Sequence, residues 1–142
     1  METSDVRKRI KDSLERAKKV AAERRVRNTE GSATYGVFLQ NSAVPVFQQA
    51  AGALKAEGYP FTVNTPAGAV RLVSDHSSHD FIDLRLDTTG TRPQVLVRVE
   101  RLKGRETTST ERPLKPGAAV NELTEQDVLD AIAEGIVELI ER

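Results

Sequence analysis

Residues 75–80, with the sequence DHSSHD, hold the side chains of this chain that are best suited to chemistry. They include both histidines of the protein, His76 and His79, and the carboxylates Asp75 and Asp80. Imidazole and carboxylate groups are ligands for zinc, nickel or iron, so these four residues are candidate metal ligands. The segment joins two expected strands, however, where such side chains diverge unless the loop is specially shaped. The sequence therefore favours a polar hairpin loop, with a metal or catalytic site and a pH-sensitive histidine contact as the alternatives.

Three arginines form a second group of candidate binding residues. Arg71, Arg85 and Arg98 alternate with apolar residues in the expected strands. This alternation places them on the water-exposed face of a sheet, beside the carboxylates of Asp83 and Glu100. Pairing of opposite charges across neighbouring strands is the favoured interpretation. An anion- or ligand-binding platform built from the three arginines is the alternative.

Other catalytic signatures do not occur in the sequence. The serines near the histidines lack the Gly-x-Ser-x-Gly pattern that exposes a nucleophile, and residues 65–69 lack the lysine of a phosphate-binding loop. The chain has no cysteine, which excludes disulfides and thiol chemistry. We therefore expect no catalytic residue and no cofactor, and we favour a protein that is not an enzyme.

The elements that position these groups are short β-rich runs separated by turn residues. The runs alternate between apolar and polar residues, which is typical of a sheet covered on one face. Their short connections favour an antiparallel meander. The sequence thus predicts an α+β fold with a meander of four to five strands, packed on one face by helices. The predicted strands are Phe61–Val63, Ala69–Val73, Asp80–Leu86, Gln94–Glu100 and Glu106–Glu111.

Two helical regions are expected to cover the apolar face of that sheet. Residues 33–57 carry a well-filled apolar face, and Pro45 in their middle predicts two helices or a kink near residues 41–44. Gly58 follows as a stop signal. The C-terminal helix is predicted to begin after Thr124 as its N-cap, with an aspartate three residues later completing a capping box.

The N-terminal segment is predicted to be a charged helical arm. Residues 4–27 are rich in Arg, Lys, Glu and Ala and contain no Gly or Pro, whereas residues 28–32 (NTEGS) are expected to break or bend the helix. Apolar side chains fall at spacings of three or four and form a narrow stripe. This stripe consists of Val6, Ile10, Leu14, Ala17 and Ala21. We therefore divide the chain into an arm, residues 1–30, and a single α+β domain, residues 31–142.

A stripe this narrow buries too little surface to stabilise a helix alone, so the arm needs a second helix. Packing on the helix at residues 33–57 is the favoured interpretation. Pairing with another copy of the chain, through Val6, Ile10, Leu14 and Ala17, is the second interpretation, and a nucleic-acid contact is the third.

Charge is distributed unevenly along the chain. The totals are 21 basic and 21 acidic residues, but residues 1–30 carry ten basic and six acidic residues, and residues 111–142 carry three and eight. This layout favours docking of one end on the other, within a chain or between two molecules. A net charge of zero argues against a dedicated nucleic-acid binder. No run approaches the about 18 apolar residues of a membrane helix, and the charged N-terminus lacks a secretory signal, so we expect a cytoplasmic protein without a membrane contact.

Four short segments carry a resemblance to other proteins. They are Val46–Phe47, Thr62–Pro66, Asp80–Leu84 and Leu123–Leu129. In these segments the chain resembles a group of short bacterial α+β proteins without an assigned activity, over about the last two thirds of its length. The resemblance implies no catalytic residues.

The residues together favour a non-enzymatic protein–protein interaction module that forms a homo-oligomer such as a homodimer. A nucleic-acid-associated protein that uses the basic N-terminal helix is the alternative. A small metal- or ligand-binding enzyme around His76 and His79 is the third hypothesis.

Overall fold

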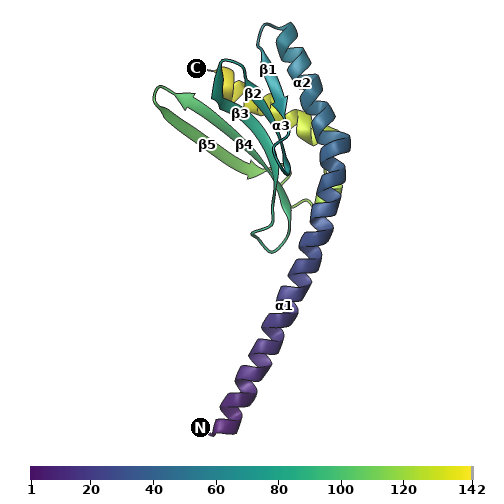
Figure 1. The fold of residues 1–142 in the computed structure, drawn as a ribbon, viewed down its shortest axis with the longest axis vertical. Coiled ribbons are helices and arrows are strands. Elements are labelled where there is room, and N and C mark those ends of the chain that lie inside the picture. Colours follow the sequence, from purple (N-terminus) through teal and green to yellow (C-terminus); the bar gives the residue numbers. More distant parts are fainter. Residues whose placement is uncertain (142) are drawn as a thin grey trace.

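The sheet is an antiparallel meander in which each strand pairs with the next strand of the chain (Figure 1). The computed structural model describes residues 1–141. The strands are β1 (Phe61–Asn64), β2 (Ala69–Ser74), β3 (Ser77–Asp87), β4 (Gln94–Lys103) and β5 (Glu106–Pro113). The predicted antiparallel meander is therefore confirmed, with five strands. The third strand is longer than predicted, because it begins within the DHSSHD segment.

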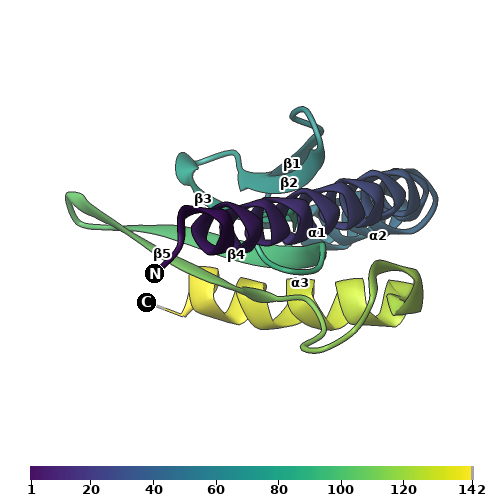
Figure 2. The same ribbon diagram turned by 90° about the horizontal axis from the view of Figure 1, so that it is seen from below.

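Alternating residues give the sheet one apolar face, and two helices cover it. The helix α2 (Val44–Ala56) contacts β1 and β2, and α3 (Glu125–Ile140) contacts β3 and β4. Figure 2 shows α3 lying along one side of the sheet. Side chains from both layers fill the core, and several are almost fully buried. These are Phe47, Val70, Leu72, Ile82, Leu84, Val97, Val128 and Ile132. The predicted α+β class, with helices on one sheet face, is confirmed.

The start of α3 follows the predicted capping pattern. The Thr124 hydroxyl accepts a hydrogen bond from the Asp127 N–H at 3.2 Å, and the Asp127 carboxylate accepts one from the Thr124 N–H at 2.9 Å. Each residue thereby satisfies a backbone donor that the helix itself leaves without a partner. A short 3₁₀ turn, η2 (Val120–Glu122), precedes this cap.

The N-terminal helix is longer than the sequence predicts. The helix α1 (Thr3–Phe38) continues through a π-helical turn, η1 (Leu39–Ala43), directly into α2. The break expected at residues 28–32 is wrong, because Gly31 lies inside α1 against Pro93 of the β3–β4 loop. A Cβ atom at Gly31 would be 2.6 Å from the Pro93 Cγ atom. This glycine therefore allows close packing of α1 on the loop and does not end the helix.

The irregularity predicted around Pro45 is confirmed. The π-helical turn ends immediately before α2, and Pro45 occupies the first turn of that helix. Proline has no N–H group to donate to the preceding turn, and its ring demands space there, so the wider turn accommodates it. At its other end α2 stops at Ala56, and Gly58 has a φ of 88°, as expected of a glycine stop signal.

The arm extends away from the domain as part of one long helix (Figure 1). Residues 1–27 are all exposed to solvent. The expectation that the arm packs on the second helix is wrong, because α1 leads into α2 along one path instead of folding back on it (Figure 1). Only near its C-terminal end does the arm meet the domain, where Arg24 Nη2 donates to the carbonyl oxygens of Thr89 and Gly90 at 2.6 and 3.0 Å. None of the helices in residues 1–141 has the length and apolar character to cross a membrane.

Candidate functional site

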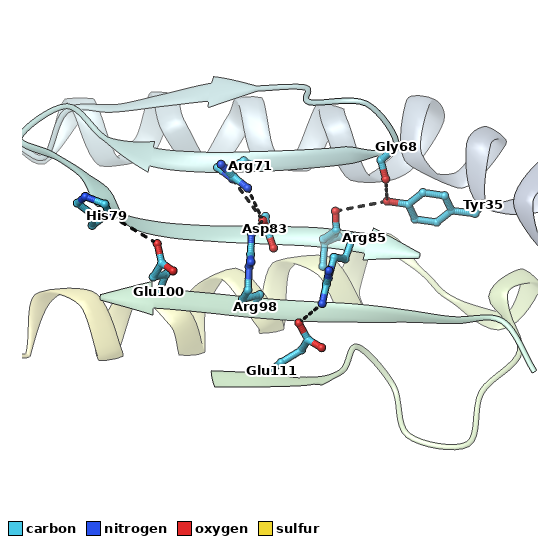
Figure 3. Close-up of polar contacts among 10 residues, drawn as sticks. Tyr35, Gly68, Arg71, His79, Asp83, Arg85, Arg98, Glu100 and Glu111 are labelled. Carbon is cyan, nitrogen blue, oxygen red and sulfur yellow. Dashed lines mark hydrogen bonds and ion pairs between the residues drawn. The ribbon is translucent and has the colours of Figure 1, made fainter. Parts of the chain in front are cut away.

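The two histidines of the DHSSHD segment are both exposed but do not lie together. His76 lies in the turn between β2 and β3. His79 is on β3, on the sheet face opposite the helices, which we call the open face. Its Nδ1 atom is 3.9 Å from the Glu100 Oε2 atom (Figure 3). One histidine thus lies in the turn and the other on β3 beside a carboxylate of β4, as expected of a polar hairpin.

The two aspartates of the segment contact different strands. The Asp75 carboxylate accepts a hydrogen bond from the Thr62 hydroxyl at 2.5 Å, beside β1. Asp80 is buried, and its Oδ1 atom accepts the Leu102 N–H of β4 at 2.8 Å. Within residues 1–141, no three His, Asp, Glu or Cys side chains are placed to hold one metal ion.

Two of the four candidate metal ligands line one small cavity. It has a volume of about 360 Å³ and is lined by His76 and Asp80, together with Tyr59, Ser74 and the apolar Leu139. Strand periodicity did not predict this pairing, because the cavity also needs the C-terminal end of α3. The cavity contains one imidazole and one carboxylate, a smaller ligand set than a zinc site uses.

A cluster of three charged residues, Asp83 with Arg71 and Arg98, lies at the centre of the open face (Figure 3). The Asp83 Oδ2 atom accepts hydrogen bonds from Arg71 Nη2 at 3.0 Å and from Arg98 Nη2 at 2.8 Å. Strand register explains this geometry, since Arg71 on β2 and Arg98 on β4 both lie directly opposite Asp83 on β3. Both guanidinium groups also lie over the Phe81 ring, at 4.1 and 5.0 Å from its centroid.

Burial strengthens the electrostatic coupling in this cluster. Asp83 is only 1% exposed, because Phe81 and the two arginines surround it. The hydrogen bond to Asp83 raises the pKa of Arg98 above its ordinary value. The second Asp83 oxygen, Oδ1, and the Arg98 Nε atom are buried without a hydrogen-bond partner among the described residues. The cluster thus shows the cross-strand charge pairing that the sequence favours, and it holds two guanidinium groups for one carboxylate.

Arg85, the third arginine of the predicted anion platform, has a different partner. It forms an ion pair with Glu111 of β5, on the same open face (Figure 3). Its charge is therefore balanced separately from the Asp83 cluster. An anion-binding role of Arg71, Arg85 and Arg98 stays a prediction.

A second cavity lies where the arm meets the domain. Its volume is about 640 Å³, within the range of small-molecule sites. Arg27 and Glu30 of α1 line it on one side, Arg92 comes from the β3–β4 loop, and Asn121 comes from η2. The three charged residues form no ion pair within residues 1–141. Sequence reasoning missed this cavity because its walls come from segments far apart in the chain.

The predicted interface residues of the arm are all exposed and form a continuous row along the helix. The predicted interface residues Val6, Ile10 and Leu14 are 44, 56 and 55% exposed, and Ala17 is exposed as well. With Ala21 they lie on one side of α1, at helical spacings of three and four. We call this surface the arm stripe.

Basic residues border the arm stripe on both sides. At 100° per residue, one border holds Lys11, Lys18 and Arg25, and the other holds Arg9, Arg16 and Arg27. The acidic residues of the same segment fall on the opposite side of the helix: Asp5, Asp12, Glu15 and Glu23. The face of the arm that carries apolar side chains is therefore also its most positive face.

The outer side of α3 carries a matching set of apolar residues with the opposite charge. Leu129, Val137 and Ile140 are 47, 57 and 37% exposed, and with the exposed Ala133 they form a row along the helix. We call these four residues the α3 row. Glu125, Asp130 and Glu141 border it. Figure 2 shows the sheet on one side of α3 and no other element of the described chain on the opposite side.

Comparison with known proteins adds no relative to these observations. No family model, curated protein or solved structure matches the chain. The resemblance to a group of short bacterial proteins therefore stays a prediction.

Proposed function

We propose that this protein is a non-enzymatic protein–protein interaction module that self-associates through its N-terminal arm. The observation that carries the proposal is the exposed arm stripe. Residues 3–27 form helix that would extend about 38 Å at 1.5 Å per residue, and they bury none of their apolar side chains. Helices in water derive most of their stability from packing an apolar face on another surface. A second protein surface on the stripe would provide that packing.

The chemistry elsewhere in the molecule fits a binding role better than a catalytic one. Asp83 is engaged by two arginines, Arg85 by Glu111, and Asp80 by the backbone of Leu102. These contacts link strands β2 to β5 to one another, so the arm extends from a well-braced domain. A nucleic-acid contact is the second candidate function, because the borders of the stripe are basic.

Sedimentation equilibrium of the full chain, up to about 500 µM to cover weak interfaces, tests the proposal. We expect a concentration-dependent mass above that of one chain. Ile10→Asp with Leu14→Asp places two charges in the stripe. Since each apolar side chain contributes about 1.5 kcal/mol or more when buried, this variant raises the dissociation constant more than about tenfold.

The control is Val26→Asp, which places a charge on the opposite side of the arm. It is expected to associate as the wild type does. Circular dichroism of both variants checks that the helix persists. A wild-type chain that stays monomeric over the whole concentration range overturns the proposal. Tight, salt-sensitive binding to a DNA duplex by that monomer would favour the second candidate.

A further inference from the structure

We infer that the arm stripe of one copy docks on the α3 row of a second copy. This inference rests on the proposed self-association and names the surface that receives the arm. It differs from the simplest model of a dimerising arm, in which two arms pair with each other. Three observations support it: the charges of the two surfaces, their apolar rows, and their separation within one chain.

The two surfaces have opposite net charge. The arm, residues 1–30, carries ten basic and six acidic residues, whereas residues 125–141 carry six acidic residues and no basic residue. The borders repeat this difference locally. Lys11 and Lys18 lie beside the arm stripe, and Asp130 and Glu141 lie beside the α3 row. Complementary charges of this kind select a partner and orient it during encounter.

The apolar parts of the two surfaces are similar in form. The arm stripe runs from Val6 to Ala21, about 22 Å along its helix, and the α3 row runs from Leu129 to Ile140, about 16 Å. Both repeat at helical spacings, which allows side chains of one helix to pack between those of the other. Small residues in both, Ala17 and Ala133 among them, let the helix axes come close.

Pairing of two arms is disfavoured by the same charges. In a two-helix pair, the residues that border one apolar stripe face those that border the other. In an arm–arm pair these would be lysines and arginines from both helices, because both borders of the stripe are basic. Like charges at such positions destabilise the pair. On α3 the same lysines and arginines meet carboxylates.

The contact has to form between molecules. The first residues of α1 and the last residues of α3 lie at opposite ends of the molecule (Figure 1). The helix runs unbroken from Thr3 to Phe38, and Arg24 fixes its root to the β3–β4 loop, so the arm stripe does not reach the α3 row of its own chain. A second copy supplies that row without any change in the fold.

Charge reversal on α3 tests the inference without altering the arm. In Asp130→Lys with Glu141→Lys, two carboxylates beside the α3 row become cations. We expect at least about a tenfold rise in the dissociation constant from sedimentation equilibrium, since like charges then face the arm borders. The control is Glu57→Lys with Glu106→Lys, which makes the same change in net charge at two exposed positions outside α3. This control is expected to associate as the wild type does.

A mixing experiment then identifies the two surfaces as partners. Lys11→Glu with Lys18→Glu reverses the arm border, and its control is Lys8→Glu with Lys19→Glu on the far side of the same helix. Each border variant alone is expected to be largely monomeric. An equimolar mixture of the arm variant and the α3 variant is expected to form a heteromer, because the reversed charges are again complementary.

Association of the α3 variant at the wild-type level, or a mixture that stays monomeric, overturns the inference. Either result leaves self-association through the arm in place, provided that the wild type still associates and the Ile10→Asp, Leu14→Asp variant does not. The failure of the docking surface is thereby distinguished from the failure of the proposed function.

Discussion

At the scale of single residues, the Asp83 side chain is buried although it lies on the sheet face that no helix covers. Its strand neighbours place two guanidinium groups on one carboxylate oxygen, and the Phe81 ring lies beneath both. A buried carboxylate is stable only when its charge is matched and hydrogen-bonded. The cluster therefore links β2, β3 and β4 through side chains as well as through the backbone.

Substitution of Asp83 by Ala is expected to destabilise the fold more than loss of an exposed ion pair. The change leaves both guanidinium groups without their acceptor, although they are about a quarter exposed and regain some water. We expect a decrease of about 1–3 kcal/mol in the free energy of unfolding. The comparison is Glu111→Ala, which breaks the more exposed pair with Arg85 and is expected to cost less than about 1 kcal/mol. Urea unfolding measures both, and equal losses would contradict the assigned role of Asp83.

Tyr35 is a second residue whose burial has a measurable consequence. Its hydroxyl donates to the Gly68 carbonyl oxygen at 3.0 Å, with the Leu84 carbonyl oxygen at 3.4 Å (Figure 3). Burial raises the pKa of Tyr35 well above its ordinary value, and the negative charge of Asp83 raises it further. The raised pKa means that the folded state keeps the phenol proton after the unfolded chain has lost it. The stabilising contribution is thus complete below about pH 10 and is lost as the pH rises above it.

The Tyr35→Phe variant separates these effects. Near pH 8 it is expected to be less stable than the wild type by about 1 kcal/mol, because it lacks the hydrogen bond to Gly68. Towards pH 11 the difference is expected to shrink or reverse, since only the wild type loses stability through ionisation of this tyrosine. Urea unfolding at both pH values gives the comparison. A difference independent of pH would show that Tyr35 ionises as freely in the folded protein as in the unfolded chain.

The sequence correctly predicted which sheet face the charged residues occupy, but it did not predict which of them are buried. Alternation along the strands correctly put Arg71, Asp83 and Arg98 on one side of the sheet. It did not indicate that Asp83 is buried, because burial there depends on the register of three strands. The same limit explains the cavity shared by His76 and Asp80, which is completed by a helix end about 60 residues later in the chain.

At the scale of elements, the fit of α3 on the sheet depends on a glycine. A Cβ atom at Gly135 would lie 2.7 Å from the Ile82 Cδ1 atom and 3.3 Å from the Val99 Cγ2 atom. Real Cβ atoms essentially never come within 3.0 Å of another heavy atom, so the helix or the Ile82 side chain must move if a methyl group is added. Close packing of this kind makes α3 a firm support for the α3 row on its outer side.

Two helical glycines with opposite expected effects test this fit. Gly135→Ala is expected to lower the free energy of unfolding by about 1–3 kcal/mol through overpacking against Ile82. Gly52→Ala in α2 has nothing within 4 Å of the added methyl group and is expected to raise stability by about 0.5–1 kcal/mol through helix propensity. Thermal or urea unfolding of both variants is the measurement. Stabilisation by both substitutions would contradict the tight contact of α3 with the sheet.

Element-level prediction succeeded where the signal is local. Strand alternation, the irregular turn before Pro45 and the Thr124 cap were all readable from a few neighbouring residues. The expected break around Gly31 failed because a glycine that stops a helix and a glycine that admits a neighbour look alike in sequence. What distinguishes them here is Pro93, which lies far away in the chain. The sequence did not predict the π-helical geometry of η1, because Pro45 indicates where the helix is irregular but not which kind of turn forms there.

At the scale of the whole molecule, the arm and α3 give the protein a positive end and a negative end. The sequence showed this asymmetry but left open whether the two ends meet within one chain or between two. The unbroken α1 helix, which directs the N-terminus away from α3, favours the second arrangement (Figure 1). The apolar area available is modest, because the arm stripe ends in two alanines. The association is therefore expected to be weak and strongly dependent on electrostatics.

Salt dependence is the corresponding prediction. Raising the salt concentration from about 50 mM to about 500 mM shortens the screening length to a few ångströms. We expect the dissociation constant of the wild type to rise severalfold, because the lysine–carboxylate contacts at the borders of the arm stripe and the α3 row are screened. Sedimentation equilibrium at the two salt concentrations provides the measurement. A dissociation constant that falls with salt would indicate a contact held by apolar surface alone.

Hydrogen–deuterium exchange at two protein concentrations tests self-association through the arm most directly. In dilute protein, the amides of residues 6–21 are expected to exchange quickly, since this part of α1 packs on nothing in its own chain. In concentrated protein we predict slower exchange in residues 6–21, and slower exchange in residues 129–140 of α3 as well. Exchange that is equally fast in the arm at both concentrations would contradict the account.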